Sequence, residues 1–322
     1  MVYQSEELPS SRLRVRELAP YLAPHGLVVE VLRYPRTMDE RRRFLSTRRD
    51  ADVILLQKKL PSTVDAFAWE HLSVPFVFDF DDAIMMRDRP KHGSYASATR
   101  SRRFTRIAKA AAGLVAGNRY LASFVEGEKP VLVLPTPVPH RVPVREHSDS
   151  GPRVVGWLGL GRNLGTLLPL AEVLARAQAE HAFVLRVISD RPLELSGVRS
   201  EWIPWSKASE DEQLARLDVG IMALSTESPW DKGKCSYKLL KYMAAGLPVI
   251  ATKVGMNEEV VSERSGFLVE GPEAWLAPLL RLSRDLELRR RMGQTGRAFI
   301  ERELTFEVAA ARLAQFLRAV AR

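Results

Sequence analysis

Residues 233–261, GKCSYKLLKYMAAGLPVIATKVGMNEEVV, decide the fold of this chain. They predict a loop, a helix, a tight turn, a buried strand and the start of a second helix. The first helix is expected to begin near Ser236, whose side-chain oxygen can accept a free backbone N–H. Gly246 and Pro248 end that helix, because glycine tolerates the left-handed conformation and proline cannot continue a helix. An apolar strand at 249–251 follows directly.

The front of this helix carries two lysines. Lys234 and Lys238 are four residues apart, which is one helical turn, next to free N–H groups and the positive end of the helix dipole. This arrangement predicts a site for a phosphate or a diphosphate. A solvated basic helix start is the alternative that charge alone leaves open.

Working outward, short apolar strands alternate with amphipathic helices in both halves of the chain, which predicts α/β layers with parallel sheets. Only residues 1–4 are available for an opening strand. The other expected strands are 28–32, 53–57, 76–80, 113–116 and 131–134, then 154–158, 183–189, 200–204, 219–223, 249–251 and 267–269. The expected helices are 11–22, 39–47, 64–72, 97–112 and 118–126, then 163–179, 210–217, 272–283, 285–302 and 305–321.

The two series are separated by residues 137–153, which are rich in proline and charge and have no periodicity. This composition predicts a linker between domains. Because two similar α/β halves are joined by one linker, we expect the active site in a cleft between them.

Composition limits the class of protein. With 322 residues, 46% apolar and 27% charged, the chain reads as a soluble protein of two domains. The uncharged runs 130–140 and 242–252 have eleven residues each, against roughly 20 for a bilayer span. No signal peptide is expected. Cys235 is the only cysteine, which excludes an intrachain disulfide and favours the cytoplasm. The six scattered histidines lack metal-ligand spacing, so no metal cofactor is expected.

The net charge is +9, and residues 1–150 contribute +6 of it, with 24 Lys and Arg against 18 Asp and Glu. Such charge suits nucleic acid, anionic lipid or a polyanionic polysaccharide, while a solvated arginine-rich surface is the alternative. No nucleic-acid motif accompanies the basic runs, so nucleic acid is not an expected partner. The clusters are Arg12, Arg14 and Arg16; Arg41, Arg42, Arg43, Arg48 and Arg49; and Arg100, Arg102, Arg103, Arg106 and Lys109.

The predicted strand at 76–80 runs into three carboxylates within FVFDFDD, namely Asp79, Asp81 and Asp82. They lie at the carboxyl end of a strand, where open α/β sheets bind ligands. There they can orient sugar hydroxyls, stabilise a cationic transition state or accept a proton. Asp79 and Asp81 share a face of the strand, so their repulsion is expected to raise at least one pKa. N-capping of the next helix explains one aspartate, and a metal site is a further alternative.

Other candidates follow the predicted strands. Arg12 is expected at the carboxyl edge of the first sheet, just after Ser10 and Ser11, either of which can cap a helix. In the second half a loop with Gly159, Gly161 and Gly165 allows close approach to a ligand, and Arg162 can add charge there. Trp205 ends a strand and can form the wall of a base pocket or belong to the core.

Several of these stretches resemble a known family. GLPVIAT followed by VGMNEE resembles the donor-binding half of GT-B glycosyltransferases, especially glycosyltransferase family 4. The resemblance covers nearly the whole chain. Its other motifs are SSRLRVRELAPYLAPHG, FVFDFDDAIM, VLPTPV and SPWDKGKCSYKLLKYMAAGLPV, the second and last of which resemble the DFDDAI and WxxGKCxxK signatures of one bacterial branch.

The resemblance implies a GT-B fold, with two Rossmann-like α/β domains facing a central cleft and a final helix that returns to the first domain. The implied domains are an acceptor-side domain at 1–140, a linker at 141–152, a nucleotide-sugar domain at 153–302 and the returning helix at 303–322. The implied function is retaining, metal-independent transfer of a hexose from a nucleotide-sugar donor to a glycan or a lipid-linked acceptor, in polysaccharide biosynthesis. A cytoplasmic location, with peripheral attachment to an anionic inner membrane surface, is also expected.

The resemblance also assigns residues. Lys234, Lys238, Ser236 and Arg12, with the loop of Gly161, Arg162 and Asn163, are expected to hold the diphosphate. Met256, Asn257 and Glu259 are expected to frame the sugar, with Trp205 near the base. Asp81 and Asp82, together with Asp79, are expected to act from the other domain.

The chain departs from the family at several positions. The usual Glu-x(7)-Glu pair corresponds to Gly233 and Lys241, and a common catalytic histidine corresponds to Asp81. The family's phosphate-binding Arg and Lys correspond to the loop of Arg162 and Asn163. Two further hypotheses therefore stay open: an inactive GT-B protein that binds glycans or acts as a scaffold, and an NAD(P)-dependent oxidoreductase that uses the loop from Gly159 to Gly165.

Overall fold

The computed structural model describes residues 1–6, 8–47, 50–125, 127, 129–139 and 142–321. Some expectations fall outside these ranges. They are Arg48 and Arg49 of the basic clusters, position 126 at the end of a predicted helix, positions 140 and 141 at the predicted linker boundary, and position 322.

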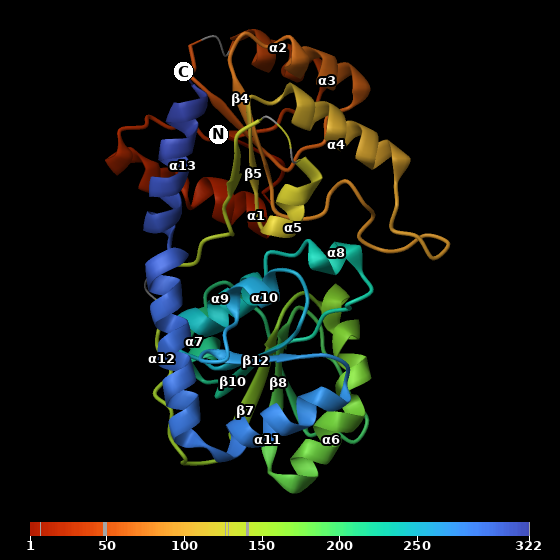
Figure 1. Cartoon of the computed structure of the whole chain (residues 1–322), viewed down its shortest axis with the longest axis vertical. Helices are drawn as coiled ribbons and strands as arrows, with labels where there is room; N and C mark the ends of the chain where they lie inside the picture. Colours follow the sequence, from red (N-terminus) through yellow and green to blue (C-terminus); the bar gives the residue numbers. More distant parts are fainter. Residues whose placement is uncertain (7, 48–49, 126, 128, 140–141, 322) are drawn as a thin grey trace. The chain divides into compact units, whose positions relative to one another are not determined.

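The chain forms two compact units. The first unit comprises Met1–Pro137, Ser228–Cys235 and Leu304–Arg322, and the second comprises Val138–Glu227 and Ser236–Glu303. Over the described residues each unit contains one parallel six-stranded sheet with helices packed on it, which confirms the predicted α/β class (Figure 1). Ser228–Cys235 belongs to the first unit, whereas the sequence analysis assigned it to the domain at 153–302.

The first sheet has the strand order β2-β1-β3-β4-β5-β6. Every residue of β4 is buried, as expected for a parallel strand covered on both faces. Its strands are β1 (Val2–Tyr3), β2 (Leu32–Arg33), β3 (Ile54–Gln57), β4 (Phe76–Phe80), β5 (Gly113–Ala116) and β6 (Val131–Val133).

The helices of the first unit begin mostly at side-chain caps. Ser62, Ser97, Asn118 and Thr305 each accept a backbone N–H at the start of α3, α4, α5 and α13, respectively. The helical elements are α1 (Pro9–Ser11), η1 (Arg12–Arg16), η2 (Ala19–His25), α2 (Met38–Thr47), α3 (Thr63–Glu70), α4 (Ala98–Ala110), α5 (Arg119–Ala122), η3 (Ser123–Val125), α8 (Pro229–Lys232) and α13 (Phe306–Val320).

The N-terminal region differs from the prediction. The helix expected at 11–22 is three short pieces: α1, the π-helical turn η1 and the 3-10 helix η2. Pro20 and Pro24 lie in η2 and lack the N–H that a continuous α-helix needs. The strand expected at 28–32 is only Leu32–Arg33, because its partner β1 offers two residues for pairing.

The second sheet has the strand order β12-β11-β10-β7-β8-β9. Counted from its first strand, this is the order 3-2-1-4-5-6 of dinucleotide-binding domains. Its strands are β7 (Arg153–Leu158), β8 (Phe183–Ser189), β9 (Ser200–Pro204), β10 (Val219–Met222), β11 (Val249–Thr252) and β12 (Gly266–Val269).

A continuous apolar core fills the space between this sheet and its helices, with Trp157, Leu185, Ile221 and Trp275 among its buried members. The helix expected at 163–179 begins instead as a 3-10 helix that contains Pro169. The helical elements are η4 (Gly161–Leu170), α6 (Ala171–Glu180), α7 (Glu210–Ala215), α9 (Tyr237–Ala244), α10 (Met256–Val260), η5 (Glu273–Trp275), α11 (Leu276–Arg284) and α12 (Leu286–Glu303).

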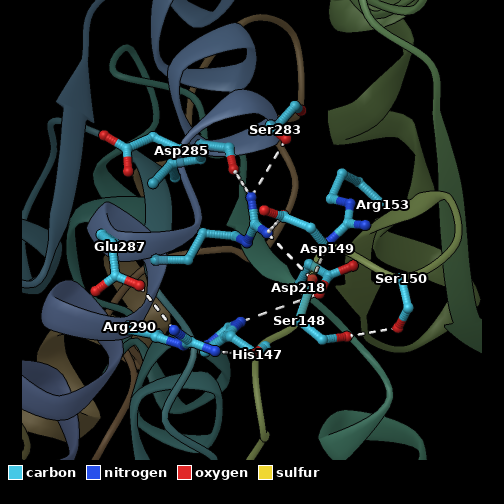
Figure 2. Close-up of polar contacts among 12 residues, drawn as sticks. His147, Ser148, Asp149, Ser150, Arg153, Asp218, Ser283, Asp285, Glu287 and Arg290 are labelled. Carbon is cyan, nitrogen blue, oxygen red and sulfur yellow. Dashed lines mark hydrogen bonds and ion pairs between the residues drawn. The ribbon is translucent and has the colours of Figure 1, made fainter.

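The predicted linker is fastened to the second unit by polar contacts (Figure 2). The buried Asp218 accepts a hydrogen bond from the guanidinium of Arg145 at 2.9 Å. The fully buried Arg289 of α12 donates to Asp149 Oδ1 at 2.8 Å. These contacts connect the described part of the segment to Asp218 and to α12, and β7 begins at its last residue, Arg153.

Within the described ranges, no helix combines the length and the apolar character needed to cross a bilayer.

Candidate functional site

Each sheet has one place where the order of its strands reverses. In the first unit this switch lies between β1 and β3, and in the second it lies between β7 and β10. Open α/β sheets bind ligands at such points, outside the carboxyl ends of the strands.

Asp79 lies in the core of the first unit. Arg14 of η1 pairs with both of its oxygens, with Nε 2.9 Å from Oδ2 and Nη2 2.5 Å from Oδ1. Burial raises the pKa of Asp79, the Arg14 pair opposes this, and the charge of Asp81 adds to it. The expected direction is therefore found, but burial and not carboxylate repulsion is the main cause. The Arg14 pair also makes Asp79 part of the packing between η1 and the sheet.

Asp81 and Asp82 follow the end of β4 and meet Lys58, which follows the end of β3. Lys58 Nζ lies 3.1 Å from Asp81 Oδ1, donates to Asp82 Oδ2, and is 3.4 Å from the hydroxyl oxygen of Ser10. Burial raises the pKa of Asp82, Lys58 lowers it and Asp81 raises it again. The two carboxylates and the ammonium thus form a charged cluster at the switch point of the first sheet.

Lys58 was not predicted as a site residue from the sequence. The signal was available, because Lys58 directly follows a predicted strand that neighbours β4, and the register pairs Gln57 with Asp79. Its backbone φ of 59° is left-handed, a conformation rarely adopted by a residue other than glycine. Left-handed positions are usually occupied by glycine or asparagine, so a lysine gave no sign of a left-handed turn after β3.

The segment Ser228–Cys235 packs on the same edge of the first sheet. Cys235 Sγ donates to the carbonyl oxygen of Asp81 at 3.1 Å, and Asn118 Nδ2 donates to the carbonyl oxygen of Lys234 at 3.1 Å. A Cβ at Gly117 would overlap the Cys235 sulfur, so the close approach requires glycine. Burial raises the pKa of the Cys235 thiol well above its usual value, which leaves it without nucleophilic character.

Lys234 is not part of a helix. Its ammonium lies 2.6 Å from Asp231 Oδ1, and its charge contributes to lowering the pKa of Asp82. The expected helical turn joining Lys234 to Lys238 is interrupted at Ser236, whose φ is 48°. Placing both lysines on one helical turn was therefore wrong.

Ser236 does not cap the helix that follows it. No backbone N–H of α9 is bonded to its side chain; instead its Oγ donates to Asn257 Oδ1 at 2.6 Å. The predicted capping role is corrected by this contact. The hydroxyl joins the start of α9 to the start of α10 within the second unit.

Lys238 lies in the first turn of α9, with its ammonium 3.9 Å from the ring centroid of the buried Trp157. It also lies over Gly159, where a Cβ would overlap the ammonium. A cation is thus held by an aromatic face next to the loop that follows β7, the first strand of the sheet. Trp157 is fully buried and Lys238 is half-buried, so neither side chain lies in bulk solvent.

The loop after β7 is partly engaged by protein groups. The N–H of Gly161 donates to Asp190 Oδ1, a bond that lowers the pKa of the Asp190 carboxyl. The N–H expected to face a phosphate therefore has an acceptor in this structure. Arg162 is exposed, and the half-buried Asn163 accepts the hydroxyl of Thr166 at its carbonyl oxygen.

The four predicted sugar and base residues have different environments. Met256 and Asn257 are buried, and Asn257 Nδ2 donates to the carbonyl oxygen of Thr252 at 2.8 Å, so its side chain orders the turn after β11. Glu259 is exposed on α10. Trp205 is 38% exposed, and its indole N–H donates to Glu210 at 2.7 Å.

Arg12 follows the first strand in η1, as expected, and its Nε lies 3.7 Å from Glu17 Oε1. Across the described ranges no group of three or more His, Cys, Asp and Glu side chains is arranged to hold a metal ion.

Lys241 and Gly233, which stand where the resemblance leads us to expect two glutamates, are closely packed in their own units. The ammonium of Lys241 is buried and lies 3.1 Å from Glu210, with a hydrogen bond to Asp211. A Cβ at Gly233 would come within 2.8 Å of the Ala83 side chain. Both positions therefore belong to the packing of their own units.

Comparison with known proteins supports the same fold. Residues 152–285 match the model of the family described as Glycosyl transferases group 1, and this range includes the strands β7 to β12 of the second sheet. A comparison with curated protein sequences gives no match.

Solved structures share the architecture of nearly the entire chain. A glycosyltransferase from Rickettsia africae has a TM-score of 0.73 at 12% identity, covering 99% of this chain and 97% of that one. HepE from Anabaena, in complex with UDP and glucose, has a TM-score of 0.71 at 16% identity, with 99% and 98% covered. Sucrose-phosphate synthase from Thermosynechococcus elongatus has a TM-score of 0.70 at 16% identity, with 94% and 92% covered. The chain therefore has the α/β fold of GT-B glycosyltransferases, and its residues 152–285 match the glycosyl transferases group 1 family.

Proposed function

We propose that this protein transfers a sugar from a nucleotide-sugar donor to a glycan or a lipid-linked acceptor. The observation that carries the proposal is the placement of Lys238, a cation held over Gly159 at the switch point of a Rossmann-type sheet. This sheet lies in the part of the chain that matches a glycosyltransferase family. The Anabaena HepE structures, which share the fold, contain UDP and UDP-glucose.

In this proposal Lys238 binds the diphosphate of the donor. When the bond between the sugar and the diphosphate breaks, negative charge grows on the leaving oxygen, and a fixed cation stabilises it without needing to reorient. The cation–π contact with Trp157 keeps the ammonium in place before the donor arrives. This source of charge supports the proposal of a metal-independent reaction, and retention of anomeric configuration is proposed from the resemblance to family 4.

The charged cluster of the first unit is assigned to the acceptor. A carboxylate near a sugar hydroxyl can orient it and accept a hydrogen bond from it as the new bond forms. Asp82 is the accessible member, because its side chain is 28% exposed against 10% for Asp81. Asp82 is therefore proposed to touch the acceptor and Asp81 to support it.

The acceptor is proposed to be anionic or held at an anionic membrane surface on the cytoplasmic side. Exposed arginines cover α4, and the loop before it adds Arg87, Arg89 and Lys91. The tip of this loop is a two-residue turn at His92 and Gly93, both left-handed, closed by hydrogen bonds between the backbones of Lys91 and Ser94. Arg89 and Lys91 are exposed next to this turn, where they can meet phosphate groups.

The first experiment measures binding and turnover with a panel of UDP-, GDP-, TDP- and ADP-sugars. Lys238→Ala is expected to weaken donor binding about ten- to hundredfold, since a charge-assisted hydrogen bond contributes about 1.5–3 kcal/mol. Lys253→Ala is the matched control, because Lys253 is an exposed lysine of the same unit paired with Glu270 at 2.9 Å. Unchanged donor affinity in Lys238→Ala would show that the phosphate role is wrong.

One observation favours a second candidate. The family's acid pair is replaced by Gly233 and the buried Lys241, so a catalytically inactive GT-B protein that binds glycans or acts as a scaffold is the alternative. The same donor panel separates the two, because the inactive protein turns over none of the nucleotide sugars.

A further inference from the structure

The cluster around Lys58 is built from three segments of the first unit that are distant in sequence. Ser10 comes from α1, Lys58 from the end of β3, and the two carboxylates from the end of β4. The ammonium side chain is only 12% exposed. The parallel pairing of β3 with β4 brings Lys58 to the carboxylates.

Burying these charges is costly unless they are paired, and two adjacent carboxylates repel each other. Lys58 compensates both at once, since its ammonium contacts Asp81 Oδ1 at 3.1 Å and donates to Asp82 Oδ2. It does so from a left-handed backbone at φ 59°, a strained conformation of the kind that clusters at functional sites.

We propose that Lys58 is the positioning residue of the acceptor side: it keeps Asp81 and Asp82 together as carboxylates and holds Asp82 at the open edge of the sheet. Only the identity of what Asp82 touches rests on the proposed transferase function. The charge arrangement itself is a property of the first unit and can be tested without any substrate.

Other charged and titratable groups also face this cluster and contribute to its pH dependence. Each acts on the electrostatics of the carboxylates: Asp79 on β4, Arg14 on η1, and Lys234 and Cys235 on the segment Ser228–Cys235. All of them stay in place when Lys58 alone is replaced.

The test is the pH dependence of thermal stability in Lys58→Met. Without the ammonium the two carboxylates face each other unpaired, so the pKa of Asp82 rises further and the folded state is penalised while both are ionised. We expect the melting temperature to fall by roughly 5–10 °C at pH 8, since breaking a buried pair is strongly destabilising. At pH 5 we expect less than half of that loss, because protonation of a carboxylate relieves the repulsion.

Three further variants make the result specific. Lys58→Arg keeps the cation and is expected to recover most of the loss. Asp82→Asn in the Lys58→Met background removes one carboxylate and is expected to restore stability at pH 8. Lys59→Met is the matched control, because Lys59 is the adjacent lysine and lies over the ring of Tyr34 instead, at 5.1 Å from its centroid.

An equal loss at both pH values in Lys58→Met, with no recovery on adding Asp82→Asn, would overturn the proposal, since that is the behaviour of a packing residue. If a donor is turned over, the acid limb of the pH–kcat/KM profile should also move to higher pH in Lys58→Met and return in Lys58→Arg. If no donor is turned over, the proposed function fails, while the stability series still decides the role of Lys58.

Discussion

At the scale of single residues, three lysines differ in the groups that compensate their charge. Lys58, Lys238 and Lys241 are all lysines removed from bulk solvent, yet each has a different partner: two carboxylates, an aromatic face, and the acids of α7. A buried lysine needs such a partner, because desolvation alone favours its neutral form. The partner, and not the residue type, separates a proposed ligand-binding lysine from one that fastens two helices.

His147 gives a pH prediction at this scale. Its Nε2 lies 2.9 Å from the carbonyl oxygen of Gly246, and burial lowers its pKa, outweighing the opposing effects of this hydrogen bond and of Asp218. The folded state therefore keeps the ring neutral, while the unfolded chain protonates it near pH 6.5. The stability that this provides is complete above about pH 6.5 and is lost as the pH falls toward the lowered pKa.

The measurement is the free energy of unfolding of His147→Gln between pH 7.5 and pH 5. We expect the variant to be less stable at pH 7.5, because the glutamine side chain does not fill the buried site of the imidazole ring, and to lose less stability than the wild type on acidification. His71→Gln is the control at an exposed histidine. A wild-type slope preserved in His147→Gln would show that other groups carry the acid sensitivity.

At the scale of elements, turns decide where the charged side chains go. The left-handed Ser236 ends the loop of the first unit and begins α9 in the second, so Lys234 and Lys238 belong to different units although only three residues separate them. The loop after β7 likewise determines where a charged side chain lies, because Gly159 leaves room for the Lys238 ammonium over Trp157.

Gly159→Ala tests this element. The added Cβ would overlap the Lys238 ammonium and lie 2.7 Å from the buried ring of Trp157, so the flexible lysine is expected to move away. We expect donor binding to weaken about tenfold, equivalent to roughly 1.4 kcal/mol. Gly165→Ala is a matched control in η4, the helix that follows this loop, since nothing lies within 4 Å of a Cβ there. Equal donor affinity in both variants would contradict the assigned role of Lys238.

At the scale of the whole molecule, charge is distributed unevenly along the chain. Of the net +9, residues 1–150 contribute +6, with exposed arginines on α4. Long-range attraction of this kind steers the protein to anionic surfaces at low salt and fades within about 8–10 Å near physiological salt.

Vesicle sedimentation tests the proposed anionic surface. We expect binding to anionic phosphatidylglycerol vesicles at low salt, little binding to neutral vesicles, and release at high salt. Reversing two exposed charges of α4, Arg102→Glu with Arg103→Glu, should abolish most of the binding. The same change at the exposed Arg264 and Arg291 of the second unit should not. No sedimentation with anionic vesicles at low salt would remove the basis for a membrane-held acceptor.

The α/β class, most strands of both sheets, and the place of Asp81 and Asp82 at the end of β4 could be predicted from the sequence, because hydrophobic periodicity and strand-end chemistry are local properties of the chain. The partners of the charged groups depend on how the chain folds. Lys58 meets Asp81 and Asp82 because β3 and β4 pair in parallel, Asp79 is neutralised by Arg14, and the Gly161 N–H is taken up by Asp190. Each of these contacts joins residues at least 20 positions apart, and no local pattern encodes that distance.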